Sequence, residues 1–302
     1  MGESRNEVLT YALNPFLQSM LVFKRCDLKD RLRLQREREN VLHARARIGQ
    51  EIAKSLTYVE HDGKVYHVLR HEAAQTLEQL LRQAPRAEQV ACVAATADLL
   101  ARIHRIAPPP PSEFAQMGYY AERLLTKFYE PVLQRKSGSM PRSLPAALRA
   151  VGERIYQELK TADIGWYKDA NPRNWLVGAQ GIIAIDFEHN ALLPVQLDLV
   201  SLLEFGPAPA SLGAKKAAFR SYLASFYGDQ AVDRRKFFQQ YRWAGLQRHL
   251  ELAGYRMRDT EDAAAQWHVE RAQRYAVKLG ERALAETLGQ VRITGGAPSA
   301  GH

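Results

Sequence analysis

The sequence predicts an α+β fold of two lobes, a small lobe with an antiparallel sheet followed by a large, mostly helical lobe. The first 70 residues alternate short apolar runs with turn signals, which is typical of β-hairpins. The remainder carries apolar residues at helical spacing, interrupted by one pair of short strands. A chain of 302 residues is long enough for two lobes, because a single hydrophobic core stops growing near ~250–300 residues.

Two hairpins and one helix are predicted in the small lobe. Residues 8–13 and 17–25 are β-rich and flank Asn14-Pro15, a turn signal. Residues 28–47 have a helical pattern, with Leu34, Val41, Leu42 and Ile48 as the predicted apolar face. Asp62-Gly63 lies between two further β-rich runs, which is a strong hairpin signal. The small lobe is therefore predicted to span 1–70.

The large lobe is predicted to span 71–290, with a disordered tail at 291–302. Its helical stretches begin at Thr76, and prolines 108–111 end the first of them. An embedded hairpin is predicted from the strands 175–178 and 181–187. The further helical stretches are 117–134, 146–161 and, after Leu197, almost the whole chain to Leu288.

Composition excludes several classes of protein. Apolar residues make up 46% and charged residues 25%, which is an ordinary globular balance. The two cysteines exclude a disulfide framework and favour a cytoplasmic setting. There is no apolar run of ~18 residues for a membrane span and no nucleic-acid-binding motif, and a secretory signal is not expected. The net charge of +9 favours an anionic partner such as a nucleotide, and a basic solvated surface is the alternative.

Three polar side chains have the spacing that phosphoryl transfer needs. Asp169 is followed five residues later by Asn174, and Asp186 comes at the end of the next predicted hairpin. One carboxylate can accept the proton of the acceptor hydroxyl, while a carboxamide and a second carboxylate can hold Mg²⁺ against the phosphates. The hairpin between them returns Asp186 towards the loop. We therefore predict Asp169 as the catalytic residue and Asn174 and Asp186 as the metal ligands.

These residues resemble motifs of the aminoglycoside phosphotransferase/choline kinase family. Residues 169–174 are similar to its catalytic loop, usually HGDxxPxNxLV, and 186–188 are similar to its metal-binding DFG segment. The spacing from Asp186 to the DLVSLL segment and residues 243–254 are most similar to bacterial anomeric kinases of N-acetylmuramate and N-acetylglucosamine. The resemblance implies a protein-kinase-like fold and ATP and Mg²⁺ as cofactors.

The resemblance also implies nucleotide-binding residues in the small lobe. Lys24 ends a β-rich run at the position of the family's phosphate-binding lysine, and Glu37 is the predicted partner, with Glu39 as the alternative. Arg70 to Glu72 correspond to the hinge that offers backbone groups to adenine. Ser4 and Asn6 belong to a short segment that resembles a reduced glycine-rich phosphate loop.

The chain departs from the family motif beside the catalytic aspartate. Tyr167 stands where the family usually has His, and Lys168 directly precedes Asp169. The Lys168 ammonium is expected either to neutralise a phosphate or anionic acceptor or to point to solvent. His104 matches a recurrent histidine of the family, for which a packed, structural role is expected.

The predicted function is ATP- and Mg²⁺-dependent phosphorylation of a hydroxyl on a small molecule, a sugar or an amino sugar. An aminoglycoside kinase is one alternative, although a polycationic acceptor calls for clustered carboxylates that the basic large lobe does not display. A pseudokinase that binds nucleotide without transfer is the other. Arg248 and His249 are candidates for acceptor binding, with an ordinary surface position as the alternative reading.

Overall fold

The computed structural model divides the chain into two compact units, which are described separately. The structure describes residues 7–14, 19–110, 113–134, 141–205 and 210–293. Unit 1 comprises Met1–Glu113, Gly165–Leu192 and Ala210–Gln230, and unit 2 comprises Phe114–Ile164, Leu193–Pro209 and Ala231–His302. The lobe boundary near residue 70 stays a prediction, because these units are interleaved along the chain rather than divided at one point.

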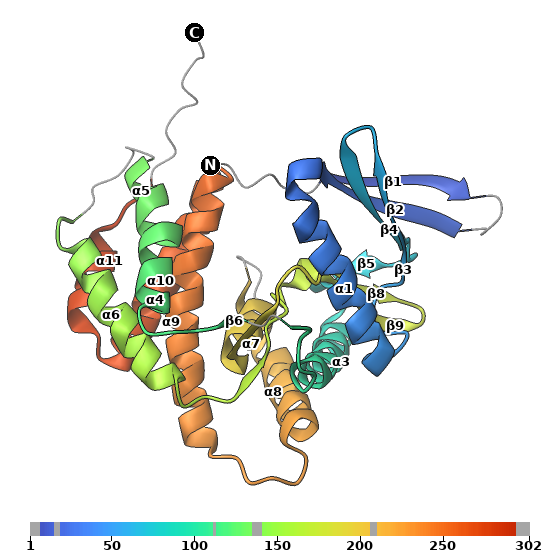
Figure 1. Ribbon diagram of the computed structural model, residues 1–302. Coiled ribbons are helices and arrows are strands. Elements are labelled where there is room, and N and C mark those ends of the chain that lie inside the picture. Colours follow the sequence, from blue (N-terminus) through green and yellow to red (C-terminus); the bar gives the residue numbers. More distant parts are fainter. Residues whose placement is uncertain (1–6, 15–18, 111–112, 135–140, 206–209, 294–302) are drawn as a thin grey trace. The chain divides into compact units, whose positions relative to one another are not determined.

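A four-stranded antiparallel sheet forms the N-terminal part of unit 1, in the order β1-β2-β4-β3. Both predicted hairpins are present (Figure 1). Asp62 and Gly63 have φ angles of 48° and 69°, so both central residues of the second turn are left-handed, as a tight hairpin requires. The strands are β1 Glu7–Asn14, β2 Ser19–Asp27, β3 Ser55–His61 and β4 Lys64–Arg70.

Helix α1, Arg31–Ile48, lies against this sheet (Figure 1). Leu34 and Val41 are fully buried, as predicted. Leu42 was predicted on the same face but is 41% exposed, because one residue along a helix turns the side chain by about 100°. The buried face also contains two polar residues, Glu37 and Asn40. Such polar burial needs partners, and these partners define the candidate site.

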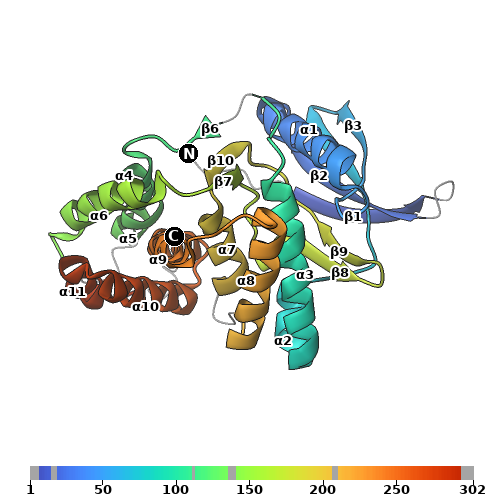
Figure 2. The ribbon, with the colours of Figure 1, turned by 90° about the horizontal axis from the view of Figure 1, so that it is seen from below.

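The rest of unit 1 combines helices with a small second sheet. Helix α3 packs lengthwise against α8 (Figure 2), and the buried His104 shares a 2.7 Å hydrogen bond with the Tyr222 hydroxyl, which confirms its packed role. Strand β9 ends earlier than predicted, two residues before Asp186, whose φ of 67° cannot continue a strand. The elements are β5 Gln75–Thr76, α2 Leu77–Gln83, α3 Arg86–His104, β8 Trp175–Gly178, β9 Gly181–Ala184 and α8 Leu212–Tyr227.

Unit 2 is helical and packs around one long helix, α9, Arg234–Arg258. A Cβ atom on Gly254 would lie 1.5 Å from the Lys127 carbonyl oxygen, so only glycine lets α9 approach this segment so closely. Lys127 belongs to a π-helical turn, Leu125–Tyr129. The other helices are α4 Tyr119–Leu124, α5 Glu130–Gln134, α6 Leu144–Leu159, α7 Val195–Glu204, α10 Asp262–Leu279 and α11 Arg282–Gln290.

Three short strands stand where the chain passes from one unit to the other: β6 Glu113–Phe114, β7 Ile164–Trp166 and β10 Ala191–Pro194. Of the predicted tail, 291–293 are described and Val291 is buried, while 294–302 lie outside the described residues. Among the described residues, every helix is too short or too polar to cross a bilayer.

Candidate active site

The loop from Asp169 to Asn174 is closed by its own hydrogen bonds. The Asn171 backbone N–H donates to the Asp169 carbonyl over 2.8 Å, and the Asn174 Nδ2 donates to the same carbonyl over 2.8 Å. The Asn171 side chain caps the following 3₁₀ turn, Pro172–Asn174, by accepting from the Arg173 N–H. The five-residue spacing thus brings Asp169 and Asn174 together in one compact turn.

The Asp169 carboxylate lies between two weak donors. The Tyr167 hydroxyl is 3.4 Å from Oδ1, and the Asn171 Nδ2 is 3.3 Å from Oδ2. Asp169 itself has a φ of 56°, a left-handed conformation that few non-glycine residues adopt. Tyr167, which replaces the usual histidine of the family, therefore reaches the predicted catalytic carboxylate.

Asp186 is returned to this loop by the β8–β9 hairpin. The Ile185 N–H donates to the Asn174 carbonyl over 3.1 Å, which joins the end of the hairpin to the loop. Asp186 is the second left-handed aspartate of the site, with a φ of 67°. Backbone strain at such positions persists only where the surroundings hold it, and it concentrates at functional sites.

Lys24, on strand β2 of the four-stranded sheet, contacts both Glu37 of helix α1 and Asp186. Its Nζ lies 2.6 Å from Glu37 Oε1 and 2.7 Å from Asp186 Oδ1. Glu37 is fully buried, whereas Glu39 is exposed and accepts a hydrogen bond from Gln35. Of the two alternatives, Glu37 is the partner of Lys24.

The charges of this trio depend on one another. Burial raises the pKa of Glu37 to about 7, although Lys24 opposes the shift. Burial also disfavours the charged forms of Lys24 and Asp186, yet attraction to Glu37 and Asp186 raises the pKa of Lys24, and attraction to Lys24 lowers the pKa of Asp186. The net result is a firmly charged lysine beside a carboxylate that stays ionised at neutral pH.

The donor set fits a hard divalent cation. Because the Asn174 amide presents its NH₂ group to a carbonyl, its Oδ1 faces the other way and can act as a ligand. Asp186 supplies carboxylate oxygens, and its side chain is 32% exposed. Glu37, Asp186 and Glu188 each offer an oxygen within 4.8 Å of the others. Oxygen donors of this kind suit Mg²⁺.

Sequence reasoning missed the residues that hold the segment after Asp186. Asn40 Nδ2 donates to the carbonyls of Phe187 and His189, over 2.8 and 3.2 Å. Arg33 pairs with Glu188 over 2.5 Å. Both come from α1, and Asn40 lies three residues after Glu37. The helical face already predicted for Glu37 therefore contained the signal for Asn40.

The remaining predicted site residues are Ser4, Asn6, Arg70 and Glu72. Ser4 and Asn6 lie outside the described residues. The Arg70 N–H donates to the Lys54 carbonyl over 2.9 Å, so that donor is used within the small lobe's own fold rather than offered to adenine. The Arg70 side chain lies 3.7 Å from Glu72. Hinge contacts from Arg70 to Glu72 stay a prediction.

Lys168 is buried, so the alternative that it points to solvent was wrong. It is only 1% exposed, and its Nζ donates to the backbone carbonyls of Ile185 and Asp186. The ammonium therefore does not point to solvent, while neutralisation of a phosphate or anionic acceptor stays a prediction. The reason is that the segment Ile185–Asp186 lies beside Lys168 and brings two backbone carbonyls within hydrogen-bond reach of its Nζ.

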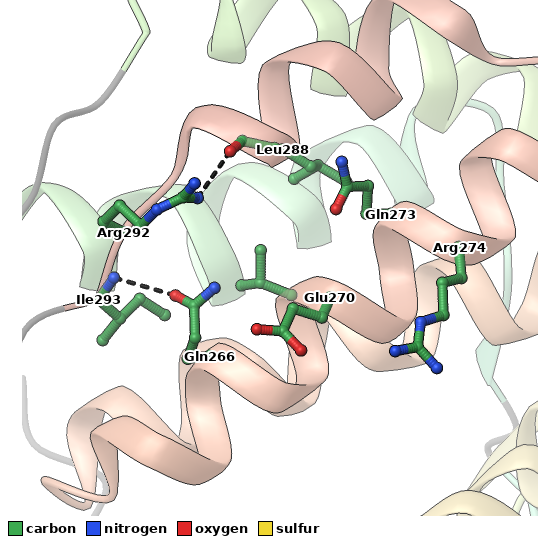
Figure 3. Close-up of a pocket in the computed structure, with 9 residues that line it drawn as sticks. Gln266, Glu270, Gln273, Arg274, Leu288, Arg292 and Ile293 are labelled. Carbon is green, nitrogen blue, oxygen red and sulfur yellow. Dashed lines mark hydrogen bonds between the residues drawn. The ribbon is translucent and has the colours of Figure 1, made fainter.

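A cavity of roughly 650 Å³ opens in unit 2 between α10 and the end of the described chain (Figure 3). Its lining is mostly polar, and two lining side chains form hydrogen bonds to backbone groups of the same unit. Gln266 Oε1 accepts from the Ile293 N–H over 3.1 Å, and Gln273 Nε2 donates to the Ala285 carbonyl over 3.1 Å. The predicted site residues that the structure describes do not line it.

The small antiparallel sheet followed by a mostly helical remainder is a protein-kinase-like fold. The chain belongs to the phosphotransferase enzyme family, whose family model matches residues 10–238. It is therefore a small-molecule kinase by family. No curated protein matches the chain in sequence.

Solved structures of low sequence identity share the fold. A choline kinase from Cryptosporidium parvum Iowa II has a TM-score of 0.57 at 12% identity, covering 96% of this chain and 93% of that one. A putative fructosamine-3-kinase from Haemophilus somnus 129PT has a TM-score of 0.58 at 11% identity, covering 89% and 87%. An aminoglycoside-3'-phosphotransferase of type VIII has a TM-score of 0.54 at 16% identity, covering 80% and 89%.

Proposed function

We propose that this protein transfers the γ-phosphoryl group of ATP, with Mg²⁺, to a hydroxyl of a small molecule, and that the acceptor is a sugar or an amino sugar. The observation that carries the proposal is the position of the Lys24 ammonium, 2.6 Å from Glu37 and 2.7 Å from Asp186. A lysine–glutamate pair beside a metal-binding carboxylate is the arrangement that kinases use to hold nucleotide phosphates.

Each residue of the site has a separate role in this proposal. Asp169 accepts or orients the proton of the acceptor hydroxyl, with Tyr167 and Asn171 fixing its two oxygens. Asn174 and Asp186 would hold Mg²⁺, which neutralises phosphate charge when bound. Lys24 would bind the nucleotide phosphates, and Glu37 keeps it in place. Positioning and electrostatics suffice, because phosphoryl transfer asks little covalent chemistry of a protein.

The charge balance of unit 2 supports a sugar-like acceptor over a polycation. The two buried glutamates among its described residues already have cationic partners: Glu204 lies 2.6 Å from Arg271, and Glu251 lies 2.5 Å from Arg123 and 3.1 Å from Arg248. A polycationic aminoglycoside would need carboxylates in excess of local cations. These two add no such excess.

The test is a coupled assay of ADP release with sugars, amino sugars, choline-like alcohols and aminoglycosides as separate acceptors. We expect Mg²⁺-dependent ADP release with at least one sugar or amino sugar, and its loss on chelation. Turnover only with aminoglycosides would overturn the acceptor proposal. A thermal shift with Mg-ATP but no turnover with any acceptor would identify a nucleotide-binding module instead.

A further inference from the structure

Lys168 is a buried ammonium with three contacts on one segment, Ile185–Phe187. Its Nζ donates to the Ile185 carbonyl and, over 3.0 Å, to the Asp186 carbonyl. It also stands 4.7 Å from the ring centre of Phe187 and 5.3 Å from that of Trp175. A buried ammonium is costly unless hydrogen bonds replace its water, so these contacts fix the side chain in one place.

The two carbonyls lie on either side of the Asp186 Cα atom. The Ile185 carbonyl belongs to the peptide plane before Asp186, and the Asp186 carbonyl belongs to the plane after it. Holding both planes fixes the φ and ψ angles of Asp186. That backbone is left-handed, with a φ of 67°, which costs free energy for a residue with a Cβ atom. These angles set the direction of the Asp186 Cα–Cβ bond, from which the carboxylate extends.

We propose that Lys168 is a positioning residue for phosphoryl transfer, which holds the Asp186 backbone in the left-handed conformation that aims its carboxylate at the metal. This inference rests on the proposed function. The family's usual loop has glycine at this position, so the side chain of Lys168 is a feature of this chain. Lys24 holds the Asp186 carboxylate, while Lys168 holds its main chain.

A positioning role and a purely electrostatic role predict opposite results. If Lys168 acted only through its charge, removing the ammonium would relieve repulsion and tighten Mg²⁺ binding. If Lys168 acts by holding Asp186, its removal weakens Mg²⁺ binding, because groups that orient metal ligands typically contribute about 10- to 100-fold in affinity. The sign of the change therefore separates the two.

The experiment compares the full-length wild type with Lys168→Met, Lys168→Gln and the control Lys54→Met, an identical substitution at an exposed lysine. Calorimetry measures ATP affinity in excess Mg²⁺ and in EDTA. We expect Lys168→Met to weaken Mg-ATP binding about 10- to 100-fold while ATP binding in EDTA is unchanged. Lys168→Gln retains an amide donor and should lie between Lys168→Met and the wild type. Lys54→Met should match the wild type.

Several outcomes would overturn the inference. Unchanged or tighter Mg-ATP binding in Lys168→Met would do so while leaving the proposed function intact. Loss of folding in both Lys168 variants would assign Lys168 to stability alone, and equal weakening with and without Mg²⁺ would mean that Lys168 acts on the nucleotide rather than on the metal ligand. A wild type that binds ATP no better with Mg²⁺ would instead overturn the proposed function, and this inference with it.

Discussion

Each unit buries carboxylates beside cationic side chains, but these carboxylates differ between the units in how many of their acceptor positions are hydrogen-bonded. In unit 2, both oxygens of Glu204 are saturated. Oε1 accepts from the Tyr241 and Tyr275 hydroxyls, over 2.9 and 2.7 Å. Oε2 accepts from His249 over 3.1 Å and from Arg271 over 2.6 Å. Its side chain is only 3% exposed, so it has neither a free lone pair direction nor a route to a ligand.

In unit 1, by contrast, the carboxylates of Glu37 and Asp186 are not fully hydrogen-bonded by the described residues. The Asp186 side chain is 32% exposed. Glu37 is fully buried, and its Oε2 accepts no hydrogen bond from the described residues. An unsatisfied buried oxygen is unfavourable unless something else compensates. The comparison shows that a saturated carboxylate stabilises the fold, while an unsaturated and accessible one is available to a cation.

The largest expected effect is on turnover in unit 1. Asp169→Asn keeps the shape of the side chain and removes its basicity, so we expect turnover to fall by about 10²–10⁴-fold with nucleotide binding nearly unchanged. The measurement is ADP release under saturating ATP, with ATP affinity measured by calorimetry. Equal turnover in the variant and the wild type would contradict the assignment of Asp169.

In unit 2 the expected effect is on stability rather than on turnover. Glu204→Ala removes an acceptor that Arg271, His249 and two tyrosine hydroxyls share, so the free energy of unfolding should fall by about 3–5 kcal/mol. Urea unfolding measures the change. The control is Glu153→Ala, which removes an exposed glutamate of the same unit and should change little. A loss below about 1 kcal/mol for Glu204→Ala would refute its structural role.

Asp186 is expected to bind the metal rather than to stabilise the fold. At a concentration about 100 times its dissociation constant, Mg-ATP should stabilise the wild type by roughly 2.7 kcal/mol. Asp186→Ala should lose most of this gain, while Lys24 keeps Glu37 as its partner. Thermal unfolding with and without Mg-ATP measures the difference. An undiminished Mg-ATP shift in the variant would mean that Asp186 is not a principal ligand.

The smallest expected effect is a pH dependence shared by the two units. Burial lowers the pKa of His67 to about 4 in unit 1 and that of His268 to about 2 in unit 2. An unfolded histidine binds a proton near pH 6.5, so the unfolded state binds more protons below that pH and stability falls as pH falls. We expect each histidine to contribute about 1–2 kcal/mol of this loss between pH 7.5 and 5.

Unfolding at the two pH values measures this effect in the wild type, in His67→Gln and in His268→Gln. Each variant should show a smaller pH dependence than the wild type. His61→Gln is the control, because the His61 side chain is 73% exposed and its substitution should leave the pH dependence unchanged. An equal pH dependence in all four proteins would show that these two histidines do not titrate in this way.

Local patterns could be predicted wherever neighbouring residues alone fix the structure. The Asp62-Gly63 turn followed from the left-handed preference of its residues, and the Asp169–Asn174 loop followed from its spacing. Burial could not be predicted in the same way. Arg248 and His249 are 4% and 0% exposed, so the alternative of an ordinary surface position was wrong. Their burial depends on acceptors, Ser201 and Glu204, that are distant in sequence.

The sequence by itself determined the order of hairpins and helices, the predicted roles of Asp169, Asn174 and Asp186, and the spacing between them that resembles the family motif. Those properties reside in short segments, where turn preference, periodicity and donor type act locally. Tertiary structure alone decided that Glu37 rather than Glu39 pairs with Lys24, and that Lys168 turns inward to two carbonyls. Such choices depend on which groups from distant segments are brought within hydrogen-bond reach, and one-dimensional spacing does not contain that distance.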